Sequence, residues 1–161
     1  MNLTNYLDQQ GITYRVYHHD ETYDAQHMAQ SIHLSGRVVA KTVMVRTAKG
    51  SEFIVVVVPA ADKVDLGRVS AILGGIEVRL ATEGEILEHS TGCELGVVPI
   101  FGSQYNMQTI VDESISHQEE VVFQGETHEE TFRMKFADFY RLEHPRIATI
   151  AKHSRDRKLV S

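Results

Sequence analysis

Apolar residues alternate or run together in seven short segments of the chain, which is the spacing typical of β-strands. Residues 52–59 contain Phe53, Ile54 and four consecutive valines without polar alternation, and this predicts a central strand covered on both faces. This run follows residues 38–47 after a turn at 48–51, so the two segments are expected to form a hairpin. The other predicted strands lie at residues 12–16, 78–80, 109–112, 120–124 and 131–136.

Apolar residues spaced three and four positions apart predict short helices between these strands. Asp65 and the pair Thr82 and Glu85 have the residue types and spacing of N-terminal caps, and Gly74 with Gly75 predicts a helix end. Helices are predicted near residues 3–7, 25–32 (capped by Thr22 or Asp24 and ended by Gly36), 66–73, 82–87 and 137–143. The pattern predicts an α+β fold with a mixed, curved or barrel-like sheet of about six to seven strands surrounded by short helices.

The chain of 161 residues contains no Pro/Ser-rich linker and no repeat, so residues 1–161 are expected to form a single domain. A net charge of −6 argues against a protein that coats nucleic acid, although it allows one that grips only the end of an RNA. The exception is a basic C-terminal tail at about 146–161, which is interpreted as a solvated helical or frayed end, with an RNA contact as the alternative.

The cellular compartment is predicted from features that would mark secretion or membrane insertion. The single cysteine cannot form an internal disulfide, and the N-terminal residues lack the basic and apolar regions of a signal peptide. The longest apolar run, residues 53–61, is too short for a transmembrane helix. A cytoplasmic protein with no membrane association is therefore expected, and its oligomeric state is left open.

A loop rich in glycine follows the fourth predicted helix. Gly92, Gly96, Pro99 and Gly102 recur at short intervals. Glycine allows positive φ and a close approach to the backbone, and proline stiffens the chain, so this loop can point successive N–H groups at an oxygen-rich ligand. The alternative is an ordinary bend between two ordered segments.

Lys41 lies in the predicted strand at residues 38–47, on the same face as Val39, Val43 and Val45. An ammonium group directed into an apolar region is costly unless it meets an anion, which favours a binding role. The alternative is that Lys41 lies near the strand end and extends its ammonium group to water.

The remaining polar residues give little support to metal or nucleophilic chemistry. None of the nine histidines forms a zinc-type set, and no Walker A, G-x-G-x-x-G or G-x-S-x-G motif occurs, so neither a metal nor a cofactor is expected. Cys93 lies inside the glycine loop without a Cys-His signature and is interpreted as packing or loop lining. His18, His19 and His128 are candidate polar site residues, and the alternative for each is an ordinary exposed histidine.

Several segments, taken in order and spacing, resemble the YbaK/ProXp superfamily over roughly residues 12–140. They are YDAQHMA at 23–29, VAKTV at 39–43, the valine strand ending at Pro59, TGCELGVVP at 91–99, VDESI at 111–115, FQGETH at 123–128 and FRM at 132–134. The resemblance implies a trans-editing aminoacyl-tRNA deacylase, a freestanding relative of the prolyl-tRNA synthetase editing domain. Such an enzyme removes a small amino acid mischarged on tRNA, with tRNA-Pro as one candidate.

The resemblance also assigns roles to residues. The family's lysine maps onto Lys41, beside the 3′-terminal phosphate or ester, and its histidine near the amino group or scissile ester maps onto His128. The catalytic set is thus Lys41, Gly96 and His128, and backbone groups around Gly92, Gly96 and Pro99 would clasp the aminoacyl moiety. The other expected substrate-binding residues are Thr42, Cys93, Val98 and Asp112. Thr42 stands where one alanine-specific subgroup has asparagine, which leaves the amino acid open.

The implied partners are the 3′ end of a mischarged aminoacyl-tRNA and an aminoacyl-tRNA synthetase. An aminoacyl ester is already activated, so it requires orientation and charge stabilisation more than a protein nucleophile. In this family the substrate's own ribose hydroxyl is thought to help position water. Three other functions remain as alternatives: a non-catalytic module that binds the aminoacyl-tRNA 3′ end, a metal-dependent hydrolase using the site histidines, and a nucleotide-binding regulator.

Overall fold

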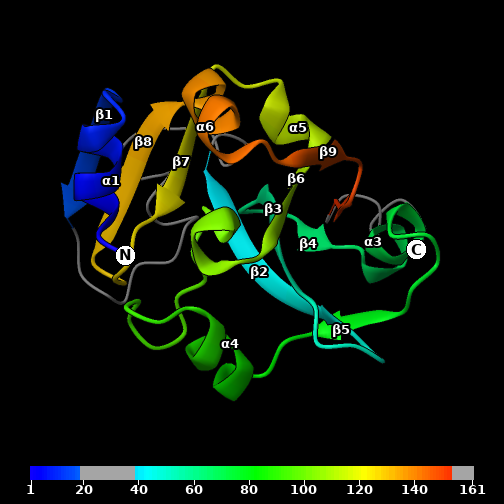
Figure 1. Ribbon diagram of the computed structural model, residues 1–161. Helices are drawn as coiled ribbons and strands as arrows, with labels where there is room; N and C mark the ends of the chain where they lie inside the picture. Colours follow the sequence, from blue (N-terminus) through cyan, green and yellow to red (C-terminus); the bar gives the residue numbers. More distant parts are fainter. Residues whose placement is uncertain (19–38, 154–161) are drawn as a thin grey trace.

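The computed structural model describes residues 1–18 and 39–153, and a five-stranded sheet lies at its centre (Figure 1). In spatial order its strands are β5 (Val78–Leu80), β2 (Ala40–Thr47), β3 (Phe53–Pro59), β6 (Gln108–Asp112) and β9 (Arg146–Ala148). β2 runs antiparallel to β3 and β5, whereas β6 runs parallel to β3 and β9, so the sheet is mixed. Every residue of β3 is buried, which confirms the predicted central strand.

A second, three-stranded antiparallel sheet covers one face of the central sheet. Its strands, in spatial order, are β1 (Tyr14–His18), β8 (Glu130–Lys135) and β7 (Glu120–Gln124). Phe123, Phe132 and Met134 from this sheet join Val55 and Val57 of β3 in one core cluster. The helices α1 (Leu3–Gln9) and α6 (Phe136–Glu143) contribute buried residues to the same cluster.

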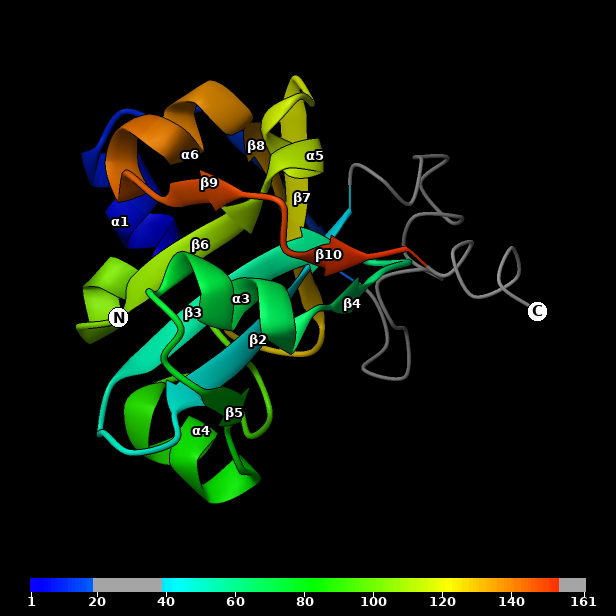
Figure 2. The same ribbon diagram turned by 90° about the vertical axis from the view of Figure 1, so that its right-hand side faces the viewer.

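The opposite face of the central sheet is covered by helix α3 (Leu66–Ile72) and a two-stranded ribbon of β4 (Lys63–Val64) and β10 (Ala151–Lys152) (Figure 2). Val69 of α3 and Ile150 pack there with Val45 and Val56 in a second core cluster. Three short elements complete the described chain: α4 (Glu83–His89), the 3₁₀ helix η1 (Gly102–Tyr105) and α5 (Glu113–Ser116). The α+β class with a mixed sheet is confirmed.

The local features predicted from the sequence are present. Asp65 Oδ1 accepts a hydrogen bond from the Arg68 N–H at 3.2 Å, and Thr82 with Glu85 forms a complete capping box at α4. Gly74 and Gly75 both have positive φ after α3. All seven predicted strands occur in the described residues, and β4, β9 and β10 are additional short strands.

The interpretation of the C-terminal tail as a solvated helical or frayed end is wrong for its first part. β9 is the edge strand of the central sheet, and β10 pairs with β4. Asp112 Oδ1 accepts hydrogen bonds from the Ile150 and Ala151 N–H groups at 2.9 and 2.8 Å, which anchors the segment between the two strands. These partners lie 38 and 39 positions apart in sequence, so no local pattern could reveal them.

Some predicted features lie outside the described residues. These are the helix at 25–32, the candidate site residue His19, and the basic residues of 154–161. Within residues 1–18 and 39–153, no helix combines the length and apolar character required to cross a membrane.

Glu143, at the end of α6, is hydrogen-bonded to residues of η1 and β6. Its side chain is 7% exposed and accepts hydrogen bonds from the Ser103 N–H and Oγ–H and from the Thr109 hydroxyl, at 2.9, 2.7 and 2.6 Å. Burial raises the pKa of this carboxyl group, with the hydrogen bonds acting in the opposite direction. The carboxylate therefore holds α6 against η1 and β6.

Glu143→Ala is expected to lower the free energy of unfolding by about 2–4 kcal/mol, because it leaves the buried Thr109 hydroxyl without its acceptor, removes two hydrogen bonds to Ser103 and opens a cavity. Urea denaturation of wild type and variant at one pH measures the difference. Glu77→Ala, at an exposed site, is the matched control and should change stability by less than about 0.5 kcal/mol. Equal effects of the two substitutions would contradict the structural role of Glu143.

Candidate functional site

The glycine loop, residues 91–99, connects α4 to the segment before η1 and has the backbone that its sequence predicts. Gly92 and Gly96 have φ values of 95° and 84°, a conformation that favours glycine. The Glu94 N–H donates to the Glu126 carbonyl at 2.8 Å, and the Val97 N–H donates to the Glu94 carbonyl at 3.0 Å. The N–H groups of Leu95 and Gly96, at the exposed tip, have no acceptor among the described residues. They are available to an oxygen-rich ligand.

His128 clamps this tip from the β7–β8 hairpin. Its Nε2 lies 2.7 Å from the Leu95 carbonyl oxygen, and its Nδ1 lies 3.2 Å from Nε2 of Gln124. Because a carbonyl oxygen only accepts, Nε2 carries the proton and the Gln124 amide donates to Nδ1. Glu94 completes the clamp by accepting the His128 backbone N–H at 3.1 Å. Both ring nitrogens are thus engaged within the protein, so His128 fixes the loop tip in place.

Thr42 connects the other end of the glycine loop to the central sheet. Its Oγ1 donates to the Val98 carbonyl oxygen at 2.6 Å. Val98 and Pro99 are buried, and Val98 packs in the core cluster between the two sheets. The loop is therefore held rigidly at its C-terminal end by Thr42 and at its tip by His128.

Lys41 precedes Thr42 on β2 and projects from the opposite face of the sheet, as the alternation of the strand predicts. It shares the face of Val43 and Val45, which pack in the second core cluster. Burial lowers the pKa of its half-buried ammonium group, Asp62 opposes that shift, and Lys63 adds to it. Within residues 1–18 and 39–153 it makes no ion pair. This is a partly desolvated cation placed to receive an anion.

Two predicted substrate-binding residues have internal partners in the structure. Cys93 Sγ lies 3.4 Å from the Tyr105 hydroxyl, and burial raises the pKa of its thiol, which keeps it protonated and weakly nucleophilic. Asp112 is 3% exposed. Its Oδ1 accepts hydrogen bonds from the Ile150 and Ala151 N–H groups, and its Oδ2 accepts hydrogen bonds from the N–H and the hydroxyl of Ser114. Both oxygens are occupied by the protein, which gives Asp112 a structural role.

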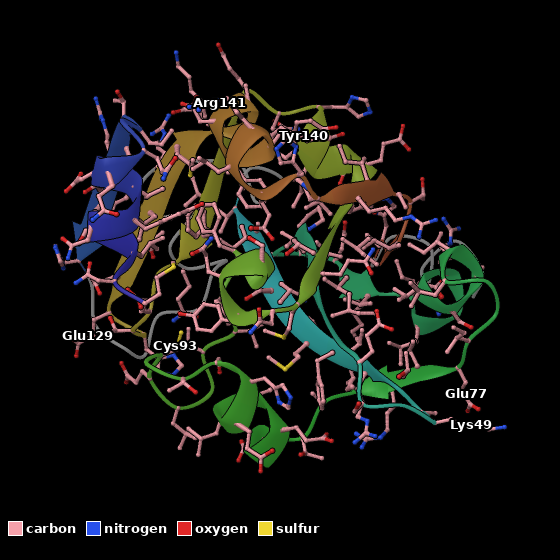
Figure 3. The ribbon with its side chains drawn as sticks, viewed as in Figure 1. Lys49, Glu77, Cys93, Glu129, Tyr140 and Arg141 are labelled. Carbon is pink, nitrogen blue, oxygen red and sulfur yellow. The ribbon has the colours of Figure 1, made fainter. Side chains whose placement is uncertain are left out.

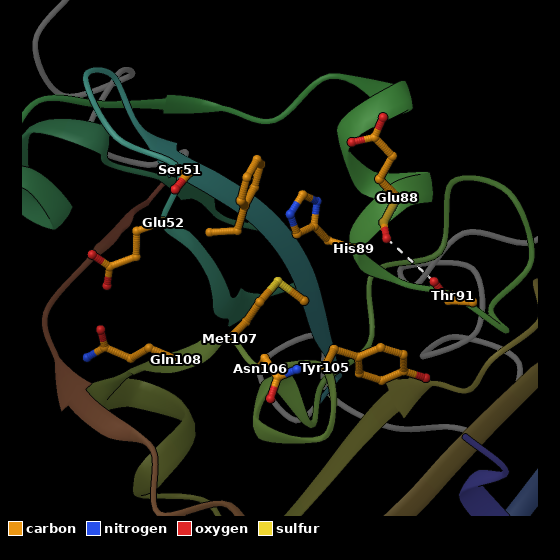
Figure 4. A pocket seen from close by; sticks show the side chains of 10 residues that line it. Ser51, Glu52, Glu88, His89, Thr91, Tyr105, Asn106, Met107 and Gln108 are labelled. Carbon is orange, nitrogen blue, oxygen red and sulfur yellow. Dashed lines mark hydrogen bonds between the residues drawn. The ribbon is translucent and has the colours of Figure 1, made fainter.

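A pocket of about 500 Å³ lies behind the glycine loop, next to Tyr105 and Thr91 (Figure 4). Phe53 and His89 stack in its wall with ring centroids 3.8 Å apart. Its ten lining residues include Glu52 and Glu88 but neither lysine nor arginine. An acidic wall without a cation repels phosphate, so this pocket is a poor site for an RNA end.

The structure thus brings Thr42, Val98, Gly96 and His128 together, and it places Lys41 one residue away on the other face of β2. Figure 3 labels Cys93 of the loop and Glu129 of the hairpin on the same side of the molecule. The sequence pattern gave no separate role to Leu95, Gln124 and Glu94, which hold His128. Their positions in the loop and hairpin segments were visible, but the contacts between the two segments span 33 and 34 residues.

Gly96→Ala tests whether the loop conformation serves a ligand or only a bend. A Cβ at Gly96 would lie 3.8 Å from the His128 ring, an ordinary contact, so the positive φ is the obstacle. The strain is about 1–2 kcal/mol, and the loop is expected to relieve it by moving Leu95 away from His128. We therefore expect a clear loss of turnover of a mischarged tRNA per folded molecule, with only a small decrease in the melting temperature.

Gly84→Ala is the control for that substitution. Gly84 lies in α4, where an added Cβ meets only Thr82 Oγ1 at 4.0 Å, so the exchange should stabilise the protein by about 0.5–1 kcal/mol. A sharp loss of melting temperature in Gly96→Ala with unchanged turnover by the folded fraction would show that the loop is only a structural bend.

Comparison with known families finds a match to the model of the aminoacyl-tRNA editing domain over residues 19–142. A curated relative, the multifunctional Ser/Thr-tRNA deacylase ProXp-y of Escherichia coli (strain K12), is 21% identical over 152 residues. The alignment covers 91% of this chain and 89% of the relative.

Two crystal structures have the same fold. One, of a hypothetical protein, superposes with a TM-score of 0.82 at 21% identity and covers 93% of this chain and 99% of that chain. The other, of a candidate trans-editing enzyme for prolyl-tRNA synthetase, has a TM-score of 0.79 at 23% identity and covers 93% and 94% of the two chains.

Proposed function

The chain belongs to the aminoacyl-tRNA editing domain family, and we propose that it is a trans-editing deacylase that hydrolyses the ester of a small amino acid mischarged on tRNA. The observation that carries the proposal is the clamped glycine loop, which offers the Leu95 and Gly96 N–H groups to an oxygen-bearing ligand. These donors suit the carbonyl oxygen of an aminoacyl ester, which gains negative charge as water attacks. The similarity to ProXp-y and to the candidate trans-editing enzyme supports the same reaction.

Each site residue has a distinct part in the proposed reaction. Lys41 holds the terminal phosphate or ester region of the tRNA from its side of β2, and the loop tip binds the aminoacyl group from the other side. His128 keeps the loop tip in position through Leu95. The substrate's ribose hydroxyl orients the attacking water, so the protein supplies position and charge stabilisation.

The amino acid is proposed to be small, with serine and threonine as the first candidates. The curated relative is a Ser/Thr-tRNA deacylase, and the loop that would enclose the side chain is fixed at its tip and at its C-terminal end. A rigid loop excludes larger residues by steric conflict, whereas one methylene too few costs only ~1–3 kcal/mol of binding. The tRNA and any synthetase partner belong to this proposal as well, with tRNA-Pro as one candidate.

A deacylation screen tests the proposal. Purified protein is incubated with a panel of tRNAs, including tRNA-Pro, charged with serine, threonine, alanine and larger amino acids, and ester loss is measured against spontaneous hydrolysis. We expect turnover of one or more small-amino-acid esters and none of the larger ones. Activity should be insensitive to a metal chelator, and loss of activity on chelation would favour the metal-dependent alternative.

Binding measured in parallel separates the enzyme from the non-catalytic module. If the protein binds aminoacyl-tRNA but accelerates hydrolysis of no ester in the panel, it is a non-catalytic binding module and not a deacylase. Absence of both binding and hydrolysis would overturn both functions.

A further inference from the structure

Three lysines gather where β2 begins. Lys41 is the second residue of β2, Lys63 begins β4, and Lys152 ends β10. Lys63 and Lys152 are directly opposite each other in the antiparallel ribbon, and Lys63 is among the charges that act on Lys41. Ala40 at the start of β2 pairs with Pro59, the last residue of β3, and β4 follows shortly after Pro59 in the chain. We call Lys41, Lys63 and Lys152 the lysine cluster.

Among the described residues, the cluster has little neutralising charge beyond that of Asp62, which acts on Lys41. Asp62, the carboxylate closest to Lys63 in sequence, is largely buried, and its Oδ2 lies 2.8 Å from Nδ1 of His153. Asp65 caps α3 and pairs with Arg68 at 3.5 Å. Within the described ranges, no cluster lysine forms an ion pair with a carboxylate. In a chain with a net charge of −6, this local excess of positive charge stands out.

The pairing of Lys63 with Lys152 works against stability. Like charges directly opposite each other in an antiparallel pair are destabilising, and the ribbon has only two residue pairs to offset that cost. Opposite charges at these positions would strengthen the ribbon. An arrangement that costs stability and leaves cations without ion-pair partners among the described residues is typical of a surface that binds an anionic ligand.

We propose that Lys63 and Lys152 bind phosphates of the single-stranded 3′ end of the tRNA and extend the contact that begins at Lys41. This inference rests on the proposed deacylase function and names the path of its substrate. The ester lies at the glycine loop on one side of β2, and the preceding nucleotides pass over the lysine cluster on the other side. The acidic pocket behind the loop is excluded from that path by its charge.

The test is the double variant Lys63→Gln/Lys152→Gln, assayed on two substrates with the same amino acid. One is the mischarged tRNA that wild type turns over best, and the other is the 2′(3′)-O-aminoacyl-adenosine, which has no phosphate. For the tRNA we expect KM to rise roughly tenfold at low salt with kcat unchanged, and the slope of log(kcat/KM) against log[salt] to become shallower by about 1.4, or ~0.7 per phosphate. Turnover of the adenosine ester should not change.

Lys49→Gln/Lys135→Gln is the matched control. It removes the same charge from two other exposed lysines, one of which, Lys49, lies in the β2–β3 turn at the opposite end of β2 from Lys41 (Figure 3). The control should leave the salt slope within about 0.3 of wild type. The melting temperature of Lys63→Gln/Lys152→Gln should be unchanged or higher, because the like-charge pair is removed.

Three outcomes would overturn the inference: an unchanged salt slope, an equal effect of the control, or an equal loss on the adenosine ester with a lower melting temperature. If wild type hydrolyses neither substrate, the proposed function fails separately. Binding of a single-stranded RNA oligonucleotide ending in CCA to wild type and double variant then decides the matter. Equal affinities would overturn the lysine cluster as a phosphate site, and weaker binding by the double variant would support it.

Discussion

Lys41→Ala is expected to lower kcat/KM for a mischarged tRNA by about 10²–10³-fold, the loss typical of removing one preorganised charge or donor from an active site. The prediction follows from a half-buried ammonium group with no carboxylate partner in the described part of the chain. Deacylation under single-turnover and steady-state conditions measures the loss. Lys49→Ala, in the exposed β2–β3 turn, should leave kcat/KM unchanged.

The fold of Lys41→Ala should remain intact. Burial lowers the pKa of this ammonium group, and a base whose folded-state pKa is lowered opposes folding while it is protonated. Removing it is therefore expected to leave the melting temperature unchanged or to raise it. Full activity of a folded Lys41→Ala protein would remove Lys41 from the site.

The same pKa shift predicts how activity depends on pH. Lys41 loses its proton at a lower pH than an ordinary lysine, so the enzymatic rate should decline as the pH rises through that lowered pKa. Spontaneous alkaline hydrolysis of the ester must be subtracted. Lys41→Arg keeps a cation at all these pH values and should retain partial activity without the decline. An identical decline in Lys41→Arg would assign the titration to another group.

His128→Ala is expected to lower kcat by about ten- to a thousandfold, with a smaller rise in KM. Without the ring, Leu95 loses the donor that holds its carbonyl oxygen at 2.7 Å, and the N–H groups of the loop tip lose their fixed position. Loss of an interaction that is made mainly in the transition state lowers kcat more than it raises KM. Steady-state kinetics of wild type and variant on the preferred substrate give both constants.

Conservative variants distinguish positioning from proton transfer. His128→Gln retains an N–H donor that can reach the Leu95 carbonyl oxygen, so it should recover most of the activity that His128→Ala loses. Gln124→Leu removes only the partner of Nδ1 and should cost less than His128→Ala. A His128→Gln variant as inactive as His128→Ala would favour proton transfer by the ring. If His128→Ala matches wild type in both constants from pH 6 to 8, His128 is an ordinary surface residue.

Local chemistry made much of the fold predictable. The caps at Asp65 and Thr82 depend on side chains that bond to N–H groups three residues away, and the turn at 48–51 joins two strands adjacent in sequence. The alternation of side chains along β2 correctly predicted that Lys41 and Thr42 project from opposite faces of the sheet. The site residues came from a different source, since only the resemblance to a family singled out His128 among nine histidines.

The sequence by itself determined the α+β class, the central valine strand, the helix caps, and the opposite directions of Lys41 and Thr42. The tertiary structure decided what surrounds each side chain: the Val98 carbonyl for Thr42, the Leu95 carbonyl for His128, and the charges of Asp62 and Lys63 for Lys41. It also decided that residues 146–152 form two strands, because Asp112 and β6 capture them from more than 30 positions away. The physical reason is that caps, turns and alternation depend on residues within a few positions of each other. Contacts between distant segments exist only once the sheets have packed.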